Sequence, residues 1–202
     1  YVADSRNDAV KRCSVTAVVD GATGELTLSF GPLVQLAQLA PGADPVAAPG
    51  PDRPFDVAAA AREDGRLDVF VASAHSHSVL RCVDDPAAAP DAGAGHSVMA
   101  RFTGAFALRY PTGLATDGST LYVVDQERHR VLGADLSSTD AVQLVSGVPA
   151  HGRSLLEDDD FDAMTSESYN RPHDCALDSG GSTLVLSSGA DNAVVLVAVT
   201  LN

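Results

Sequence analysis

The sequence predicts an all-β fold, a β-propeller of small four-stranded antiparallel sheets, and three observations indicate it. First, one pattern of apolar runs and turns recurs four times along the 202 residues. Second, each copy consists of short apolar, β-branched runs separated by polar turns. Third, a further run with period-two alternation follows in three of the copies. Because such a small sheet buries its faces only against its neighbours, the copies are expected to stack as propeller blades.

The overlay of the copies places two strands in every blade. The apolar runs that begin at Tyr1, Phe70, Tyr122 and Val185 align without gaps. Each is followed at a constant interval by a valine, which opens the next apolar run: Val10, Val79, Val131 and Val194. Two apolar runs at a fixed separation in all four copies predict a hairpin of two adjacent strands.

A further strand precedes this hairpin in three copies and another follows it in three. The preceding strand begins at a proline in the segments PFDVAAA from Pro54, PTGLATD from Pro111 and PHDCALD from Pro172. The following strand is expected at residues 25–30, 97–102 and 141–145. The first copy has no proline segment, so the chain is expected to open at the second strand of a blade.

The strand pattern predicts one domain, residues 1–202, with blades at about 1–40 (partial), 53–105, 110–147 and 170–202 (partial). The last copy supplies first, second and third strands, which overlap with those of the first copy and do not complement them. We therefore expect about four blades of a larger ring, an incomplete or open propeller in which remaining blades or a second chain complete the circle. A four-bladed arrangement closed by imperfect edge blades is the alternative.

The third copy resembles the NHL repeat. It has the proline, small residue, alanine and aspartate that lead into an apolar strand, then an acidic turn and a His-Arg-Val step: Pro111, Gly113, Ala115, Asp117, Tyr122, Asp125, His129, Arg130 and Val131. The resemblance implies a propeller whose closed form is commonly six-bladed. It implies no single activity, because propellers of this kind include both binding modules and enzymes.

The composition restricts the partners. The formal net charge is −14, with 13 basic residues against 27 acidic ones, so the counterion release that drives nucleic-acid binding is disfavoured. No apolar run approaches the roughly 20 residues of a membrane span. We expect a protein or peptide partner, no nucleic acid and no membrane.

Cysteine usage bears on the compartment. The count is odd, and Cys13 and Cys82 occupy equivalent places on successive blades, too far apart for a disulfide. With Cys175 they are interpreted as three small buried thiols. The odd count, the lack of an Asn-x-Ser/Thr sequon and an N-terminus that looks truncated favour an intracellular chain.

The candidate site lies at the mouth of the central channel, where the proline-led innermost strands begin. The residues expected to bind ligand there are Phe55, Asp56, Thr112, His173 and Asp174. The leading hypothesis is a non-enzymatic scaffold that binds a protein, peptide or small ligand without a cofactor, using this mouth and the loops at the blade edges.

A metal-dependent lyase or hydrolase is the alternative. His173 follows a proline, as in the peptidyl-hydroxyglycine amidating lyases, whose Pro-His steps hold a catalytic zinc. The equivalent positions here are Phe55 and Thr112, which are not zinc ligands. His75 and His77 form a His-x-His pair that suits a metal, although an exposed polar turn is the preferred interpretation. The acidic residues 157–160 are interpreted as a solvated loop, with calcium binding as the alternative.

Overall fold

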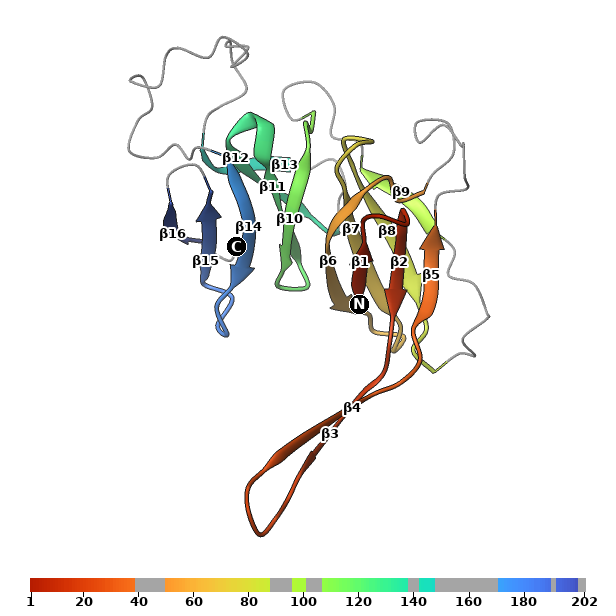
Figure 1. Ribbon diagram of the computed structural model, residues 1–202. Coiled ribbons are helices and arrows are strands. Elements are labelled where there is room, and N and C mark those ends of the chain that lie inside the picture. Colours follow the sequence, from red (N-terminus) through yellow and green to blue (C-terminus); the bar gives the residue numbers. More distant parts are fainter. Residues whose placement is uncertain are drawn as a thin grey trace.

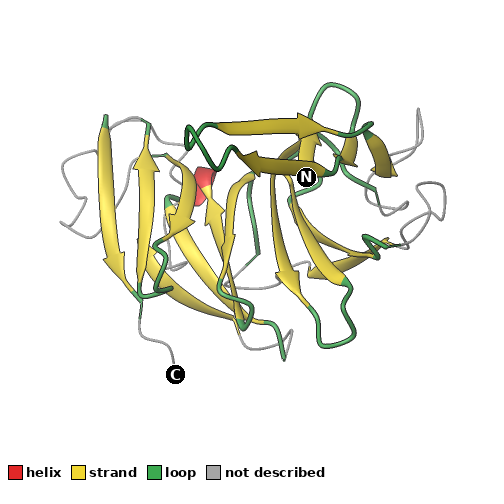
Figure 2. Cartoon of the chain, turned by 90° about the horizontal axis from the view of Figure 1, so that it is seen from below, coloured by secondary structure: helices red, strands yellow, loops and turns green. Residues whose placement is uncertain are grey.

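The prediction of an all-β propeller fold is confirmed. A computed structural model describes residues 1–38, 50–87, 96–100, 107–137, 142–147, 171–189 and 192–199 (Figure 1). These residues form antiparallel sheets that lie side by side in chain order, and the short helix η2 (Gln126–Arg128) stands out among them in Figure 2. No helix in the described part of the chain is long and apolar enough to cross a membrane.

The second and third blades have four strands each, joined in sequence order. The second blade consists of β6 (Pro54–Ala61), β7 (Leu67–Ser73), β8 (Ser78–Asp84) and β9 (His96–Ala100). The third blade consists of β10 (Pro111–Thr116), β11 (Thr120–Asp125), β12 (Arg130–Asp135) and β13 (Val142–Gly147). The strands predicted from the third copy are therefore present, in the predicted order.

The first and fourth blades are three-stranded sheets within the described residues. The first blade has the order β1 (Val2–Asp4), β2 (Ala9–Arg12) and β5 (Val34–Gln38). The fourth has the order β14 (Pro172–Leu177), β15 (Thr183–Ser188) and β16 (Ala193–Ala198). The first blade thus begins with the strand that is second in the other blades, as expected from the overlay.

One strand prediction was wrong in its partner. Residues 25–30 were expected to close the first blade, but β4 (Leu26–Phe30) pairs only with β3 (Val15–Val19), in a two-stranded hairpin that projects from the blades (Figure 1). The outer strand of the blade is β5, which pairs with β2. The alternation of apolar and polar residues identifies a strand and its two faces, but it does not identify the neighbouring strand. Here the tight turn at Asp20 brings β3 next to β4, so β4 pairs with β3 and not with the blade.

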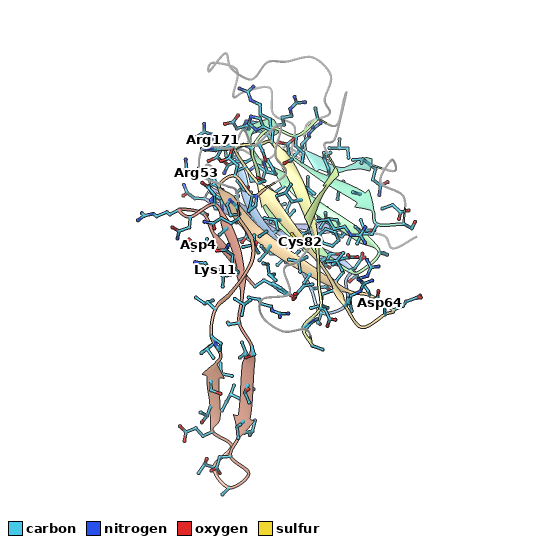
Figure 3. All side chains as sticks on the ribbon, turned by 90° about the vertical axis from the view of Figure 1, so that its right-hand side faces the viewer. Asp4, Lys11, Arg53, Asp64, Cys82 and Arg171 are labelled. Carbon is cyan, nitrogen blue, oxygen red and sulfur yellow. The ribbon has the colours of Figure 1, made fainter. Side chains whose placement is uncertain are left out.

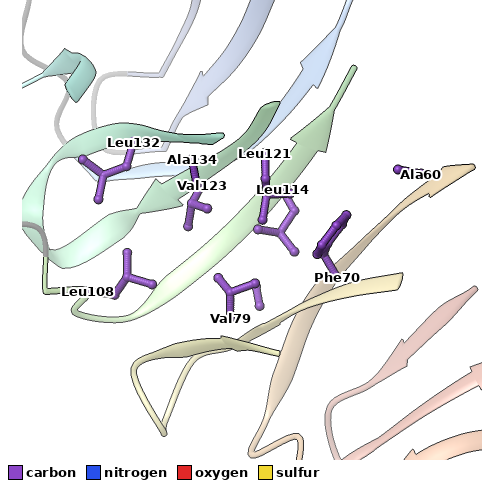
Figure 4. Close-up of a cluster of buried hydrophobic side chains, with 10 residues drawn as sticks. Ala60, Phe70, Val79, Leu108, Leu114, Leu121, Val123, Leu132 and Ala134 are labelled. Carbon is purple, nitrogen blue, oxygen red and sulfur yellow. The ribbon is translucent and has the colours of Figure 1, made fainter. Parts of the chain in front are cut away.

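The hydrophobic core lies between successive blades. Figure 4 shows the cluster between the second and third blades, where Phe70 and Val79 pack against Leu114, Leu121 and Leu132. A second cluster joins the first blade to the second, and a third joins the third blade to the fourth. Successive sheets therefore bury the faces that they turn toward each other, which is the reason such blades require one another.

An ionic contact adds to the junction between the first and second blades. Arg12 Nη1 lies 2.8 Å from Oδ2 of the buried Asp84, and the Tyr1 hydroxyl donates a 2.8 Å hydrogen bond to the same carboxylate. Burial raises the pKa of Tyr1, and the hydrogen bond to Asp84 raises it further. Residues that lie far apart in the sequence thus tie β1 and β2 to the end of β8.

The three cysteines are free thiols, as predicted, but they are not equally buried. Cys82 and Cys175 are buried, whereas Cys13 is half-exposed, because it lies past the end of β2 where the chain leaves the blade. Burial raises the pKa of Cys82 to about 11 and also raises that of Cys175, with the charge of Asp174 adding to the second shift.

Thiol reactivity should follow this difference. Because the thiolate is the reactive species, we expect one thiol, Cys13, to react with Ellman's reagent in the folded protein at pH 8, and all three to react in denaturant. Cys13→Ser should leave no fast-reacting thiol. Two or more fast thiols in the folded wild type would contradict the burial of Cys82 and Cys175.

Candidate ligand-binding site

A β-bulge opens the innermost strand of three successive blades. The pairing of β6 with β7 shifts register between Pro54 and Asp56, and the same shift occurs at the start of β10 and of β14. The bulged residues are Phe55, Thr112 and His173. A bulge leaves one residue out of the ladder and re-aims its side chain. The overlay had singled out these three residues, and the structure gives them one common backbone geometry.

A repeated hydrogen bond fixes the start of each of these strands on the preceding blade. The residue before the proline has a positive φ in all three blades, which is uncommon outside glycine. Its backbone N–H donates to a side chain in the hairpin turn of the blade before. The three bonds run from Arg53 N to Asp8 Oδ1 (2.8 Å), from Tyr110 N to His77 Nδ1 (3.2 Å), and from Arg171 N to His129 Nδ1 (3.0 Å).

Four rings gather at this end of the molecule, and we refer to Phe55, His75, Tyr110 and His173 as the mouth cluster. The rings of Phe55 and Tyr110 meet edge to face with centroids 5.5 Å apart, and those of Phe55 and His173 lie 6.3 Å apart. His75 lies 5.9 Å from Tyr110. The rings of Phe55 and Tyr110 are half-buried, while those of His75 and His173 are exposed. The cluster therefore presents aromatic surface to solvent.

Thr112 separates Phe55 from His173 in blade order but is small and buried. Because its side chain is short, the two larger rings on either side reach each other. Its Oγ1 atom is buried without a hydrogen-bond partner. Thr112 therefore contributes space and not a contact surface.

Cationic groups border the mouth cluster. Arg53 Nη1 lies 3.1 Å from His75 Nε2, and His75 Nδ1 lies 3.8 Å from Asp52 Oδ1. Since the guanidinium only donates, Nε2 of His75 accepts and its hydrogen lies on Nδ1, facing the carboxylate. Arg171 is also exposed at this end, and Figure 3 shows it with Arg53 far from the projecting hairpin.

The two predicted carboxylates have different surroundings. Asp56 accepts from the backbone N–H of Val57 and, across to the next blade, from that of Leu114, both at 2.7 Å. Burial raises its pKa, and the charge of Asp174 adds to the shift even though the two hydrogen bonds oppose it. Asp174 is exposed and accepts from the N–H of Cys175 at 2.8 Å. Asp56 thus joins two blades, and Asp174 faces solvent beside His173.

The histidines of the His-x-His pair lie in different environments. His77 uses Nδ1 to accept from Tyr110, whereas His75 belongs to the mouth cluster. No group of three or more His, Cys, Asp or Glu side chains that could hold a metal occurs in the described part of the chain. Residues 157–160 lie outside the described residues.

Two members of the site, Tyr110 and Arg53, were not predicted. Both precede a proline that the overlay had used, so extending the overlay by one residue would have shown that equivalent positions hold Arg53, Tyr110 and Arg171. The contact of Tyr110 with rings from two blades has no sequence signal, because it depends on how the blades stack.

The fold defines the class of protein as a β-propeller, and solved structures that are similar to the chain are propeller-like. An auxiliary nutrient binding protein from Bacteroides thetaiotaomicron aligns with 89% of this chain and 42% of its own at 12% identity and a TM-score of 0.52. A protein of unknown function from the same organism aligns with 95% of this chain and 42% of its own at 16% identity, also with a TM-score of 0.52.

A candidate 6-phosphogluconolactonase from Bacteroides uniformis aligns with 93% of this chain and 61% of its own at 14% identity and a TM-score of 0.50. The chain therefore spans less than two thirds of the length of these structures. No protein-family model and no curated protein matches the sequence. At these identities the similarity concerns the fold alone.

Proposed function

We propose that this chain is a non-enzymatic binding scaffold, built of NHL-type blades, whose mouth cluster binds a peptide segment of a partner protein. The observation that carries the proposal is the placement of Phe55 and His173 by equivalent bulges, with their rings in contact at one end of the blades. Three blades contribute to this surface, so it exists only in the folded propeller.

The rings suit recognition of an apolar or aromatic side chain. Tyr110 and Phe55 offer large contact areas and few rotatable bonds, so little entropy is lost when they are fixed against a ligand. His75 and His173 add polar ring atoms at the exposed border. Such surfaces are typical of the residues that dominate binding energy in protein interfaces.

The cations suit an acidic group beside that side chain. The chain as a whole carries a net charge of −14, yet the exposed Arg53 contacts His75, and the exposed Arg171 lies two residues before His173 in the sequence. A guanidinium pairs well with a carboxylate, and opposite charge across an interface selects among partners. We therefore infer a peptide that places an aspartate or glutamate next to an aromatic or large aliphatic residue.

The surrounding polar groups support binding and not catalysis. Asp56 accepts two backbone N–H groups, and the Nδ1 atoms of His77 and His129 each accept one. These groups hold the blades together instead of meeting as an acid and a base around a common point, as general acid–base catalysis would need.

The test is selection of peptides from a phage-displayed library on the wild-type chain. Selected peptides, synthesised and titrated calorimetrically, should bind Phe55→Ala and His173→Ala at least about tenfold more weakly. Arg53→Ala should weaken the binding of acidic peptides and make the loss salt-dependent. Arg66→Ala, at the far end of the second blade, is the matched control and should bind as the wild type does.

Equal binding to Phe55→Ala and wild type would place the peptide elsewhere and refute the mouth as the site. Metal analysis addresses the lyase alternative. Stoichiometric zinc that disappears in His173→Ala would contradict the non-enzymatic proposal.

A further inference from the structure

The β3–β4 hairpin stands apart from the blades. It leaves the first blade after β2 and returns to it at β5, and the pairing of Arg12 with Val34 places its base at the end of the blade away from Asp8 and the mouth. All ten strand residues of the hairpin are exposed. Figure 3 shows no other described segment against it. An isolated two-stranded hairpin is at best marginally stable in water.

One face of this hairpin is entirely apolar. In the antiparallel register, directly paired residues share a face, and the pairs Val15–Phe30, Ala17–Leu28 and Val19–Leu26 alternate with Thr16–Ser29 and Val18–Thr27. We call the first set the apolar face: Val15, Ala17, Val19, Leu26, Leu28 and Phe30. Apart from the small Ala17, its side chains are between 48% and 68% exposed. An exposed contiguous patch of this kind marks an interaction surface.

We propose that the apolar face binds the same face of a second copy of this chain, so that two hairpins pack face to face about a twofold axis. The face carries no charged or hydrogen-bonding side chain, so nothing on it selects a chemically different partner. A patch of purely apolar side chains is complementary to itself, and twofold contacts pair identical patches. Interfaces of this composition are typical of homodimers.

The acidic tip of the hairpin determines the relative direction of the two copies. Asp20 follows β3 and accepts from the N–H groups of Ala22 and Thr23, and Glu25 precedes β4. In an antiparallel arrangement these carboxylates lie a hairpin length apart, roughly 17 Å for five residues. That exceeds the screening length of about 8 Å at physiological ionic strength, so their repulsion is small. A parallel arrangement would bring four carboxylates together.

The area is sufficient for a reversible dimer. Burying two apolar faces, each with about half of its side-chain surface exposed, removes on the order of 1,000 Å² from water, near the lower limit for a specific interface. We therefore expect a concentration-dependent equilibrium with a Kd on the order of micromolar. Because the chains are both acidic, added salt should strengthen the association instead of weakening it.

The dimer would leave both mouths open, since the hairpin and the mouth cluster lie at opposite ends of the first two blades. A bivalent scaffold of this kind gains avidity for a partner that repeats its binding segment. The dimerisation does not depend on the proposed peptide binding, and it is measured without any ligand.

The experiment is sedimentation equilibrium of the wild type, Leu28→Asp and Thr27→Asp from about 1 to 200 µM, a range that brackets the expected Kd. The two aspartates occupy adjacent positions on opposite faces of β4. The wild type and Thr27→Asp should approach twice the monomer mass at high concentration, whereas Leu28→Asp should remain monomeric. Circular dichroism melts should show all three propellers equally folded, and Val19→Asp replaces Leu28→Asp if that variant unfolds.

A wild type that stays monomeric over this range overturns the proposal. Binding of the hairpin to a different protein would not rescue it, because the proposed occupant is a second copy of this chain. A dimer that persists in Leu28→Asp overturns it as well, because another surface then holds the copies together. Loss of the dimer in both variants overturns the assignment to the apolar face. Dimerisation that weakens with added salt contradicts an apolar interface.

Discussion

Asp125→Ala is expected to lower the free energy of unfolding by about 3–5 kcal/mol, as removal of one partner from a buried ion pair does. Asp125 and Arg130 are both fully buried, and Arg130 Nε donates to Asp125 Oδ2 at 3.0 Å. The other carboxylate oxygen accepts from the backbone N–H of Arg109 at 2.7 Å. The substitution leaves a guanidinium without its counter-ion and a backbone donor without its acceptor, inside the third blade.

Equilibrium unfolding in guanidinium chloride, followed by circular dichroism, measures this loss. Asp64→Ala is the control, because Asp64 pairs with Arg66 on the surface and its removal should leave the unfolding midpoint nearly unchanged. Replacing both partners, Asp125→Leu with Arg130→Met, should recover much of the stability, since no uncompensated charge remains. A cost of Asp125→Ala no larger than that of Asp64→Ala would show that the pair is solvated.

The repeat made most of the fold predictable. Apolar runs at a constant separation identify hairpins, and the copies at Phe70 and Tyr122 form the hairpins β7–β8 and β11–β12, which share one register. Three of the residues that carry the resemblance to the repeat have structural roles: Asp125, His129 and Arg130. Asp125 and Arg130 form the buried pair, and His129 holds the next blade through Arg171. The contact of His129 recurs between blades, because Asp8 and His77 make the equivalent bond, whereas the pair of Asp125 and Arg130 lies within the third blade.

The hairpin could not be predicted from the repeat because it is an insertion into it. Residues 26–30 have the same alternation as a blade strand. Alternation shows which side chains share a face of the strand, but not which part of the protein covers that face. The sequence of β5 is equally compatible with a strand, so the repeat does not distinguish the two segments. Only the pairing of β2 with β5 shows which segment completes the blade.

The sequence indicated which strand starts carry the candidate site, but it did not indicate all of its residues or their contacts. Phe55, Thr112 and His173 were found because each follows an aligned proline, which is a property of single blades. Their contacts are a property of the stack: Phe55 reaches His173 past a small Thr112, and Tyr110 joins them from the residue before its proline. A single-blade alignment does not contain distances between blades, so this part of the site needed the structure.

Gly113→Ala is expected to destabilise the protein by about 1–3 kcal/mol and to disturb the mouth at the same time. A Cβ at this position would lie 2.7 Å from Asp174 Cα and 3.0 Å from Cys175 N, and backbone atoms cannot rotate away from it. The innermost strands β10 and β14 would have to separate. That movement loosens the core between the third and fourth blades and draws His173 away from Phe55.

Gly21→Ala is the matched control, because a Cβ there meets nothing within 4 Å and its substitution should be neutral. Chemical denaturation measures the stability of both variants, and titration with a mouth-selected peptide measures the second effect, which we expect only in Gly113→Ala. A Gly113→Ala variant as stable as the wild type would refute the close approach of the two strands. A variant that is destabilised but binds the peptide with unchanged affinity would show that the position of His173 does not depend on the spacing of β10 and β14.

In the alignment of the copies, Gly113 is equivalent to an aspartate in the other two copies. The neighbouring backbone of β14 explains why this position of the third blade does not accommodate a side chain.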